Sequence, residues 1–245
     1  MADSWFYTPR PVQHPRLRLF CFPFAGGTAQ VFREWPKNLP PDIEVCAVQL
    51  PGRGARLREK SFRRMEPMVE ALTEALQDRM DRPFAFFGHS LGALIAFTLT
   101  QKLRLENLPG PQLLFLSGRR APQLPSKESL RLLSDSQFIA ALNARYGGIP
   151  EAVLREPELL ALFLPVLRAD FEVLETWAHT PGEPLEIPIA AFGGLSDQVA
   201  TRADIEQWKE HTTSSFSCHL FTGGHFFFQS AQTELFNLLA RALAP

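Results

Sequence analysis

An α/β fold with a mostly parallel central sheet flanked by helices is predicted by three features of this 245-residue sequence. Short, almost continuously apolar runs recur along the chain, as is typical of strands buried on both faces of a parallel sheet. They alternate with segments whose apolar residues repeat every three or four positions, the pattern of amphipathic helices. Most of the runs end at turns containing glycine or proline. The length suits one sizeable core, so we expect residues 1–245 to form a single domain.

The expected strands and helices follow one another in the order of a parallel α/β sheet. The strand runs are Leu17–Phe22, Ile43–Leu50, Phe84–Phe87, Leu113–Leu116, Ile187–Phe192 and Phe216–Phe221. The helical patterns are Phe32–Leu39 (short or irregular), Met65–Met80, Leu94–Leu103, Ser134 or Asp135 to Tyr146, Pro157 towards Trp177 with a bend or break at Pro165, Ile205–Lys209 and Ala231–Leu243.

The sequence Gly88-His89-Ser90-Leu91-Gly92 stands between the strand run Phe84–Phe87 and the helical pattern Leu94–Leu103. Strand, sharp turn and helix in this order are what a nucleophile elbow requires, because the glycines let the two backbones approach while the serine is exposed at the tip. We therefore predict that Ser90 is a nucleophile. The amide of Leu91, at the helix start, would donate to an oxyanion on the attacked group. The alternative is a glycine-tolerant turn without a catalytic role.

A second glycine-containing loop, Pro23-Phe24-Ala25-Gly26-Gly27, follows the first long strand. A glycine pair after a strand allows a tight turn whose amides face inward. The α/β-hydrolase fold places its second oxyanion donor in such a loop, so we predict that the amide of Ala25 has this role. The alternative, an ordinary strand-to-helix turn, is compatible with this role because the turn presents the amide.

Asp197 and His225 each follow a late strand and lie in a loop with a pair of glycines. The chain order Ser90, Asp197, His225 is that of an α/β-hydrolase triad. His225 would take the proton of the serine hydroxyl, and Asp197 would orient the imidazole. The alternative acids are Asp170, in a helical segment, and Asp204, a candidate helix cap. None of the five other histidines combines a late strand end with a glycine pair: His14, His89, His179, His211 and His219.

The segment between the strand runs Leu113–Leu116 and Ile187–Phe192 is long, helical and strongly apolar. A helix that is apolar most of the way round is buried or faces an apolar pocket. We predict that residues 119–180 form a helical lid inserted before the last strands, covering Ser90 and lining an acyl-binding channel. The alternative is a structural subdomain without a pocket.

The charge balance gives no sign that the protein as a whole is strongly basic or strongly acidic, as a protein that binds an oppositely charged partner would be. With 25 basic and 26 acidic residues the net charge is −1, so nothing favours nucleic-acid binding. A local basic cluster is expected to be a solvated loop and helix face, with a docking patch for an acidic partner as the alternative. It consists of Arg53, Arg56, Arg58, Lys60, Arg63 and Arg64.

Other sequence signals predict a cytoplasmic protein without metal or cofactor. Cys21, Cys46 and Cys218 lie far apart, as expected of buried free thiols in a reducing compartment. The first 18 residues lack the apolar core of a secretory signal, and no apolar window is long enough to span a membrane. Histidines and cysteines show no metal-ligand spacing, and no glycine loop matches a phosphate- or dinucleotide-binding motif.

Several motifs together resemble those of the type II thioesterases, the stand-alone editing enzymes of polyketide and non-ribosomal peptide synthases. The medium-chain thioesterase of fatty-acid synthesis is in the same group. The resemblance covers nearly the whole chain and is carried by Phe22-Pro23-Phe24-Ala25-Gly26-Gly27, Leu50-Pro51-Gly52-Arg53, Phe86-Phe87-Gly88-His89-Ser90-Leu91-Gly92, Leu167-Arg168-Ala169-Asp170 and Gly223-Gly224-His225-Phe226.

The resemblance implies hydrolysis of acyl groups held as thioesters on the phosphopantetheine arm of acyl or peptidyl carrier protein domains, clearing stalled units or releasing a fatty acid early. It places the family's triad on Ser90, Asp197 and His225, and its oxyanion donors on Ala25 and Leu91. Phe24 departs from many bacterial members, which have a polar or histidine residue there, and this bears on acyl preference. The alternatives are a carboxylesterase, an acyltransferase using the same triad, and a non-catalytic binding protein.

Overall fold

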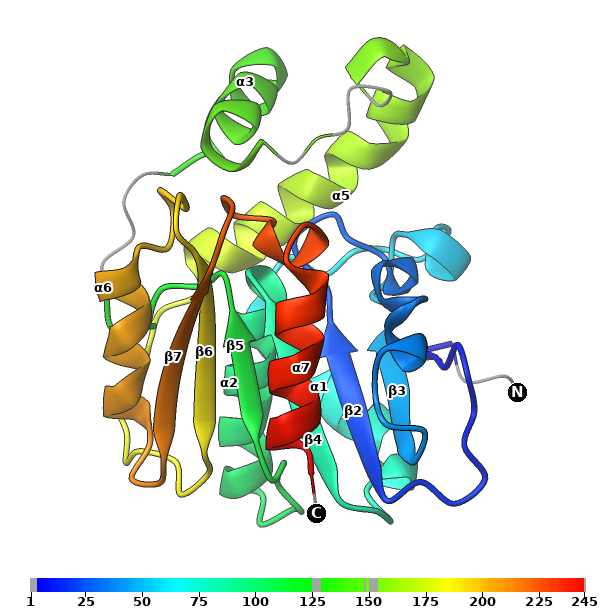
Figure 1. Cartoon of the computed structure of the whole chain (residues 1–245). Helices are drawn as coiled ribbons and strands as arrows, with labels where there is room; N and C mark the ends of the chain where they lie inside the picture. Colours follow the sequence, from blue (N-terminus) through cyan, green and yellow to red (C-terminus); the bar gives the residue numbers. More distant parts are fainter. Residues whose placement is uncertain (1–3, 125–128, 148, 150–153, 245) are drawn as a thin grey trace.

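A seven-stranded sheet lies at the centre of the computed structural model, which describes residues 4–124, 129–147, 149 and 154–244 (Figure 1). The strand order in the described chain is β1-β3-β2-β4-β5-β6-β7. All pairings are parallel except that of β1 with β3, which is antiparallel. The strands are β1 (Phe6–Tyr7), β2 (Leu17–Phe22), β3 (Ile43–Val48), β4 (Phe84–His89), β5 (Leu114–Ser117), β6 (Ile189–Gly194) and β7 (Phe216–Phe221). The predicted mostly parallel sheet is confirmed.

Helices cover both faces of the sheet. One face carries α1 (Met65–Leu76), α2 (Leu91–Leu105) and α6 (Arg202–Glu206). The other carries α7 (Gln232–Ala242) and the 3-10 turns η1 (Ala29–Phe32), η2 (Trp35–Lys37) and η6 (Phe227–Gln229). Further 3-10 turns are η3 (Gly54–Arg56), η4 (Gln77–Arg79) and η5 (Gln207–His211). Within the described residues, no helix is long and apolar enough to cross a membrane.

Strand β4 shows why the strand runs are apolar at every position. All six of its residues are buried. Phe84 and Phe86 pack into the core on the side of α1 and α2, whereas Ala85 and Phe87 pack into the core on the side of α7. Since successive side chains point to opposite faces, a strand covered on both faces favours apolar residues at every position. The polar residue of β4, His89, stands at the end of the strand and is hydrogen-bonded to Ser117 Oγ at 2.9 Å.

The predicted elements are present, with shifted boundaries, and one strand was not predicted. Strand β1 is only two residues long, too short to show a periodic pattern. Cys21 and Cys46 are buried free thiols as expected, and burial raises the pKa of Cys46 to about 12. Cys218, in contrast, is only half-buried, because it lies on the edge strand β7.

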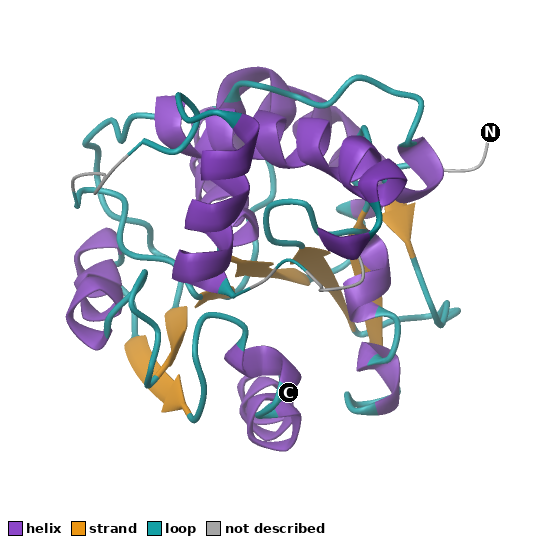
Figure 2. Cartoon of the chain, turned by 90° about the horizontal axis from the view of Figure 1, so that it is seen from above, coloured by secondary structure: helices purple, strands orange, loops and turns teal. Residues whose placement is uncertain are grey.

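The chain between β5 and β6 carries α3 (Asp135–Tyr146) and α5 (Pro157–Thr176). Both helices lie beyond the carboxyl ends of the parallel strands, and Figure 2 shows helices crossing above this end of the sheet (Figure 1). Helix α3 begins as predicted, with a capping box between Ser134 and Gln137, and it ends at Gly147 with φ 60°. That the 119–180 segment acts as a lid stays a prediction, and residues 125–128, 148 and 150–153 within it lie outside the described part.

Helix α5 is continuous through Pro165, so the alternative of a break there is wrong. Proline removes the hydrogen bond to the carbonyl of Ala161. Because Ala161 and Pro165 are exposed, water can bind that carbonyl instead. The buried residues of α5 all follow Pro165, while Leu159 and Leu162 before it are 49% and 57% exposed. The all-round apolar helix is therefore buried only in its second half.

Replacing Gly88 by alanine is expected to destabilise the fold by about 1–3 kcal/mol or more, through overpacking. A Cβ on Gly88 would lie 2.1 Å from the carbonyl oxygen of Gly92, which is backbone and cannot turn away. Denaturation with guanidinium chloride measures the loss. Gly182→Ala is the matched control, because nothing lies within 4 Å of its Cβ position. Equal stability of the two variants would contradict the account.

Candidate active site

Ser90 occupies a strained turn between β4 and α2. Its φ of 55° and ψ of −109° are unusual for a residue with a side chain. The turn is fixed by a hydrogen bond of 2.8 Å from the Ser90 amide to the carbonyl of Ser117 in β5. Gly88 and Gly92 permit the close approach, since a Cβ on Gly92 would lie 2.0 Å from the carbonyl oxygen of Phe22. This is the geometry of a nucleophile elbow.

The amides of Ala25 and Leu91 lie in the two segments that the elbow brings together. Gly92 packs against the end of β2, which leads directly into the loop containing Ala25. In that loop the amide of Gly26 donates to Asp170 Oδ2 at 2.7 Å, and the amide of Gly27 donates to the carbonyl of Phe24 at 2.8 Å. Leu91 begins α2, so its amide has no acceptor within the helix. Both amides are suitably located to serve as oxyanion donors, and this role stays a prediction.

The structure brings Asp197 and His225 into contact. The loops after β6 and β7 touch because Gly194 lacks a side chain: its Cβ would lie 2.2 Å from the carbonyl oxygen of Gly224. His225 Nδ1 donates to Asp197 Oδ2 at 2.8 Å. Asp197 Oδ1 accepts from the amides of Val199 and Ala200 at 2.8 and 3.2 Å. The carboxylate is therefore fixed at both oxygens, and the bond to Nδ1 leaves His225 Nε2 free to accept a proton.

Ser90 and His225 line the same small cavity of about 50 Å³. His225 Nε2 is buried and forms no hydrogen bond to any described residue, so Ser90 and His225 are not hydrogen-bonded in this state. Catalytic hydrogen bonds are often long before substrate binds. The rest of the cavity wall is almost entirely apolar: Phe24, Ala25, Leu142, Tyr146, Ile149, Phe163, Leu167, Phe171 and Phe226. Such a cavity suits an apolar group on the substrate carbonyl.

Asp170, the alternative acid, is occupied elsewhere. It is fully buried in α5 and forms two hydrogen bonds with the guanidinium of Arg53, of 2.5 and 2.8 Å. The same carboxylate accepts from the amide of Gly26, next to Ala25. Asp170 thus joins α5 to two core loops and does not contact His225. Asp204, the other alternative, caps α6 with Thr201, as its sequence position suggested.

The expectation that the whole basic cluster is solvated is wrong for two of its members. Arg53 and Arg56 are only 4% and 7% exposed. Arg53 is neutralised by Asp170, and Arg56 pairs with Glu59 and lies over the Trp5 ring at 3.9 Å. Asp170 is 117 residues away from Arg53 in the sequence. Glu59 is only three residues from Arg56, but the two belong to no periodic pattern. The sequence therefore did not indicate that these two arginines are paired and buried. The other four cluster residues are exposed: Arg58, Lys60, Arg63 and Arg64.

Two aromatic residues, Tyr146 and Phe24, also line the site. Tyr146 was not predicted to lie there, and Phe24 was expected only to affect acyl preference. Tyr146, the last residue of α3, lies edge-on to His225 with ring centroids 4.9 Å apart. Phe24 packs against Phe226 at 4.9 Å and narrows the cavity at Ser90. The sequence offered a signal for Phe24, which is next to Ala25. Tyr146 could not be found, because its position depends on how α3 packs over the sheet.

The stability of the fold is expected to fall as the pH decreases below about 6.5. His89 is buried, and burial together with the nearby His225 lowers its pKa well below 6.5. The unfolded chain therefore takes up a proton at His89 that the folded chain does not, and acid favours unfolding. Urea denaturation at pH 7.5 and 5.5 measures the effect. His89→Gln should reduce this pH dependence, and an unchanged dependence in the variant would refute the assignment.

Metal ligands are not grouped in the described residues. No cluster of three or more histidine, cysteine, aspartate or glutamate side chains that could hold a metal ion occurs there. The site itself brings together a serine, an imidazole, a carboxylate and backbone amides.

The comparisons with known proteins agree with this geometry. The family model described as "Thioesterase domain" matches residues 17–243. The gramicidin S biosynthesis protein GrsT of Aneurinibacillus migulanus is 41% identical over 243 residues, covering 99% of this chain and 94% of the relative.

Two solved structures are also similar. RedJ, a thioesterase from the prodiginine pathway of Streptomyces coelicolor, has a TM-score of 0.88 and 38% identity, over 96% of this chain and 92% of its own. BorB, a type II thioesterase from the borrelidin biosynthetic cluster, has a TM-score of 0.90 and 33% identity, over 100% of this chain and 99% of its own. The likeness confirms the predicted α/β-hydrolase fold. Because the family model and these relatives match along almost the whole sequence, the chain belongs to the thioesterase family and is an acyl-thioester hydrolase.

Proposed function

We propose that this enzyme is a type II thioesterase that removes acyl groups from the phosphopantetheine arm of carrier protein domains in a multi-enzyme synthase. The observation that carries the proposal is the Asp197–His225 hydrogen bond beside the elbow serine, in a chain whose residues 17–243 match the thioesterase family model. GrsT and BorB, by their names, serve gramicidin S and borrelidin biosynthesis, which supports a carrier-bound substrate here.

In the first half of the proposed reaction, Ser90 attacks the thioester carbonyl and His225 Nε2 takes the hydroxyl proton. The amides of Ala25 and Leu91 hold the oxyanion of the tetrahedral intermediate. The C–S bond then breaks, and the pantetheine sulfur leaves as a thiol with the proton that His225 returns. Asp197 keeps Nδ1 protonated throughout and stabilises the imidazolium form.

In the second half, His225 removes a proton from water, and the resulting hydroxide attacks the acyl-Ser90 ester. The same amides hold the second oxyanion. Collapse returns the proton to Ser90 and releases the carboxylic acid. A thiol is a good leaving group, so specificity is expected to come from the fit of the acyl group and the arm rather than from the chemical step.

A panel of substrates tests the proposal. Release of acid should be measured from acyl-loaded carrier proteins, free acyl-pantetheine thioesters and aryl oxyesters of the same acyl group, with Ser90→Ala as control. The account predicts the highest kcat/KM for carrier-bound thioesters and release slower by about 10⁴-fold or more in the variant. Equal or faster turnover of oxyesters would identify a carboxylesterase. Transfer of the acyl group to an added alcohol or amine, in place of water, would identify an acyltransferase.

A further inference from the structure

His89, the residue before Ser90, is a buried histidine that the proposed reaction does not use. It ends β4 and is only 1% exposed. Ser117, the last residue of β5, is its partner across the sheet, and His89 Nδ1 is hydrogen-bonded to Ser117 Oγ at 2.9 Å. His89 Nε2 is buried and has no hydrogen-bond partner among the described residues. Because an unpaired buried polar atom is costly, a histidine at this position needs a reason beyond filling the core.

The ring of His89 packs against the segments that carry the other catalytic groups. Its centroid lies 5.1 Å from that of the His225 ring. Phe228, in the turn that follows His225, is 4.6 Å away, and Phe24, in the predicted oxyanion loop, lies edge-on at 6.1 Å. Since His89 is the chain neighbour of Ser90, one side chain connects the elbow, the oxyanion loop and the histidine loop.

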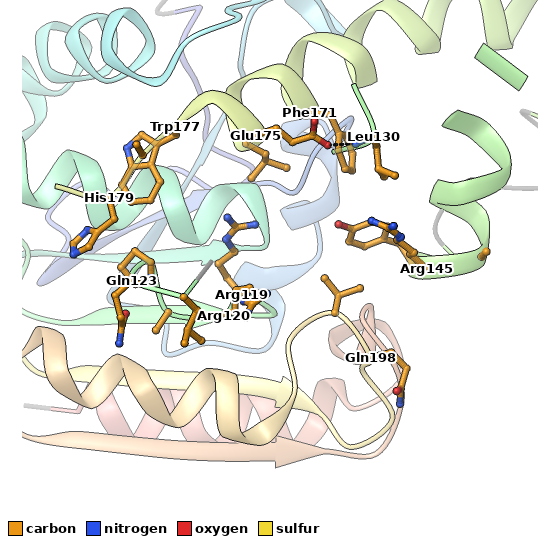
Figure 3. A pocket seen from close by; sticks show the side chains of 18 of the residues that line it. Arg119, Arg120, Gln123, Leu130, Arg145, Phe171, Glu175, Trp177, His179 and Gln198 are labelled. Atoms are coloured by element: carbon orange, nitrogen blue, oxygen red, sulfur yellow. Dashed lines mark hydrogen bonds between the residues drawn. The ribbon is translucent and has the colours of Figure 1, made fainter. Parts of the chain in front are cut away.

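The end of β5 holds the His89 ring in one orientation. Gly118, which follows Ser117, leaves the space for it, since a Cβ on Gly118 would lie 2.5 Å from His89 Cε1. The next residue, Arg119, already belongs to the wall of a separate pocket of about 760 Å³ (Figure 3). The Ser117 hydroxyl fixes the rotation of the ring, and the missing side chain at Gly118 permits it.

His225 depends on packing for the direction of its Nε2. Among the described residues, the one hydrogen bond of its side chain runs from Nδ1 to Asp197. The last torsion of a histidine side chain is soft, so a ring held at one nitrogen can swing and carry Nε2 away from Ser90. The His89 ring restricts this swing on one side, and the Tyr146 ring, 4.9 Å away, packs edge-on against the same imidazole.

We propose that His89 is a positioning residue, which holds the imidazole of His225 in the orientation in which Nε2 takes the proton of Ser90. The inference rests on the proposed function, because it assumes the triad. The ring at position 89 has to be neutral, since a cation there would repel the imidazolium that forms at His225 during attack. Burial and the nearby His225 meet this need by lowering the pKa of His89 well below 6.5.

His89→Phe tests the proposal, because it keeps a ring but loses the hydrogen bond that orients it. We expect kcat for an acyl-pantetheine thioester to fall by about 10- to 100-fold, the cost of misplacing a catalytic group by about 1 Å. KM should stay at the wild-type value, because the lining of the Ser90 cavity includes neither His89 nor Ser117. The rate of Ser90 labelling by an alkyl fluorophosphonate should fall by the same factor as kcat.

Ser117→Ala provides a second, milder variant, which removes the hydroxyl and retains the backbone carbonyl that binds the Ser90 amide. We expect its kcat to fall by about 3- to 10-fold. The double variant should be no slower than His89→Phe alone, because the hydroxyl acts only through the His89 ring. A purely structural role in the core would lower stability and leave this coupling in kcat absent.

His211→Phe is the matched control. His211 is another hydrogen-bonded histidine, whose Nε2 lies 2.6 Å from Oε1 of Gln123, a residue of the separate pocket (Figure 3). The folded control should keep the wild-type kcat and labelling rate.

Two results would overturn the inference: a kcat within about twofold of wild type in folded Ser117→Ala and His89→Phe, or losses that multiply in the double variant. If His89→Phe does not fold, Ser117→Ala alone decides. Aryl oxyesters, assayed alongside, separate this inference from the proposed function. The position of His225 matters for either bond, so both activities should fall by the same factor. A preference of the wild-type enzyme for oxyesters would refute the proposed function and leave the role of His89 standing.

Discussion

Ser90→Ala is expected to lower kcat for acyl-pantetheine hydrolysis by about 10⁴-fold or more, because removal of a triad nucleophile leaves only binding and the oxyanion donors. The variant should stay folded. The bond that fixes the turn is made by the backbone amide of Ser90, which alanine retains, and an alanine fits wherever the serine does. Stopped-flow or steady-state release of free thiol measures the rate.

Ser214→Ala is the matched control for this experiment. Ser214 is exposed in the turn before β7, at the opposite end of that strand from His225. It should retain wild-type kcat and KM. If Ser90→Ala keeps more than about one hundredth of the wild-type rate while remaining folded, another group performs the attack, and the proposed mechanism is wrong.

Asp170→Ala is expected to lower the free energy of unfolding by about 3–5 kcal/mol, since it leaves the charge of Arg53 buried and unpaired. Both side chains are almost fully buried, at 0% and 5% exposure. The substitution also removes the acceptor of the Gly26 amide, so the loop that carries Ala25 loses a support. We therefore expect a lower kcat as well as lower stability, with denaturant titration and thiol release as the two measurements.

A double-mutant cycle separates the ion pair from simple loss of packing. Arg53→Met should be strongly destabilising alone, but the Arg53→Met, Asp170→Ala double variant should lose less than the sum of the two, because neither charge is then left unpaired. Glu206→Gln, which breaks the exposed pair with Arg202, is the control and should leave stability nearly unchanged. Additive losses in the cycle would contradict the assigned role of the pair.

The sequence was informative wherever function depends on local backbone geometry. The elbow around Ser90 and the glycine loops before Asp197 and His225 have sequence patterns because close backbone approaches demand glycine at fixed positions, as Gly88 and Gly194 show. Six of the seven strands of the described sheet were predictable because both of its faces are covered.

What could not be predicted depends on contacts between distant segments. The pairing of Arg53 with Asp170 joins residues 117 apart, and a periodic pattern cannot reveal it. Tyr146 reaches His225 only because α3 lies across the end of the sheet.

The most direct test of the account is to label the nucleophile covalently. The protein is treated with an alkyl fluorophosphonate, which phosphonylates an activated serine with loss of fluoride, and the modified peptide is identified by mass spectrometry, with His225→Ala and Asp197→Asn alongside. The account predicts one adduct, on Ser90, that forms much more slowly in both variants, because each impairs removal of the serine proton. An adduct on any other residue, or labelling of Ser90 at an undiminished rate in the His225 variant, would contradict the assignment of these three residues as the catalytic triad.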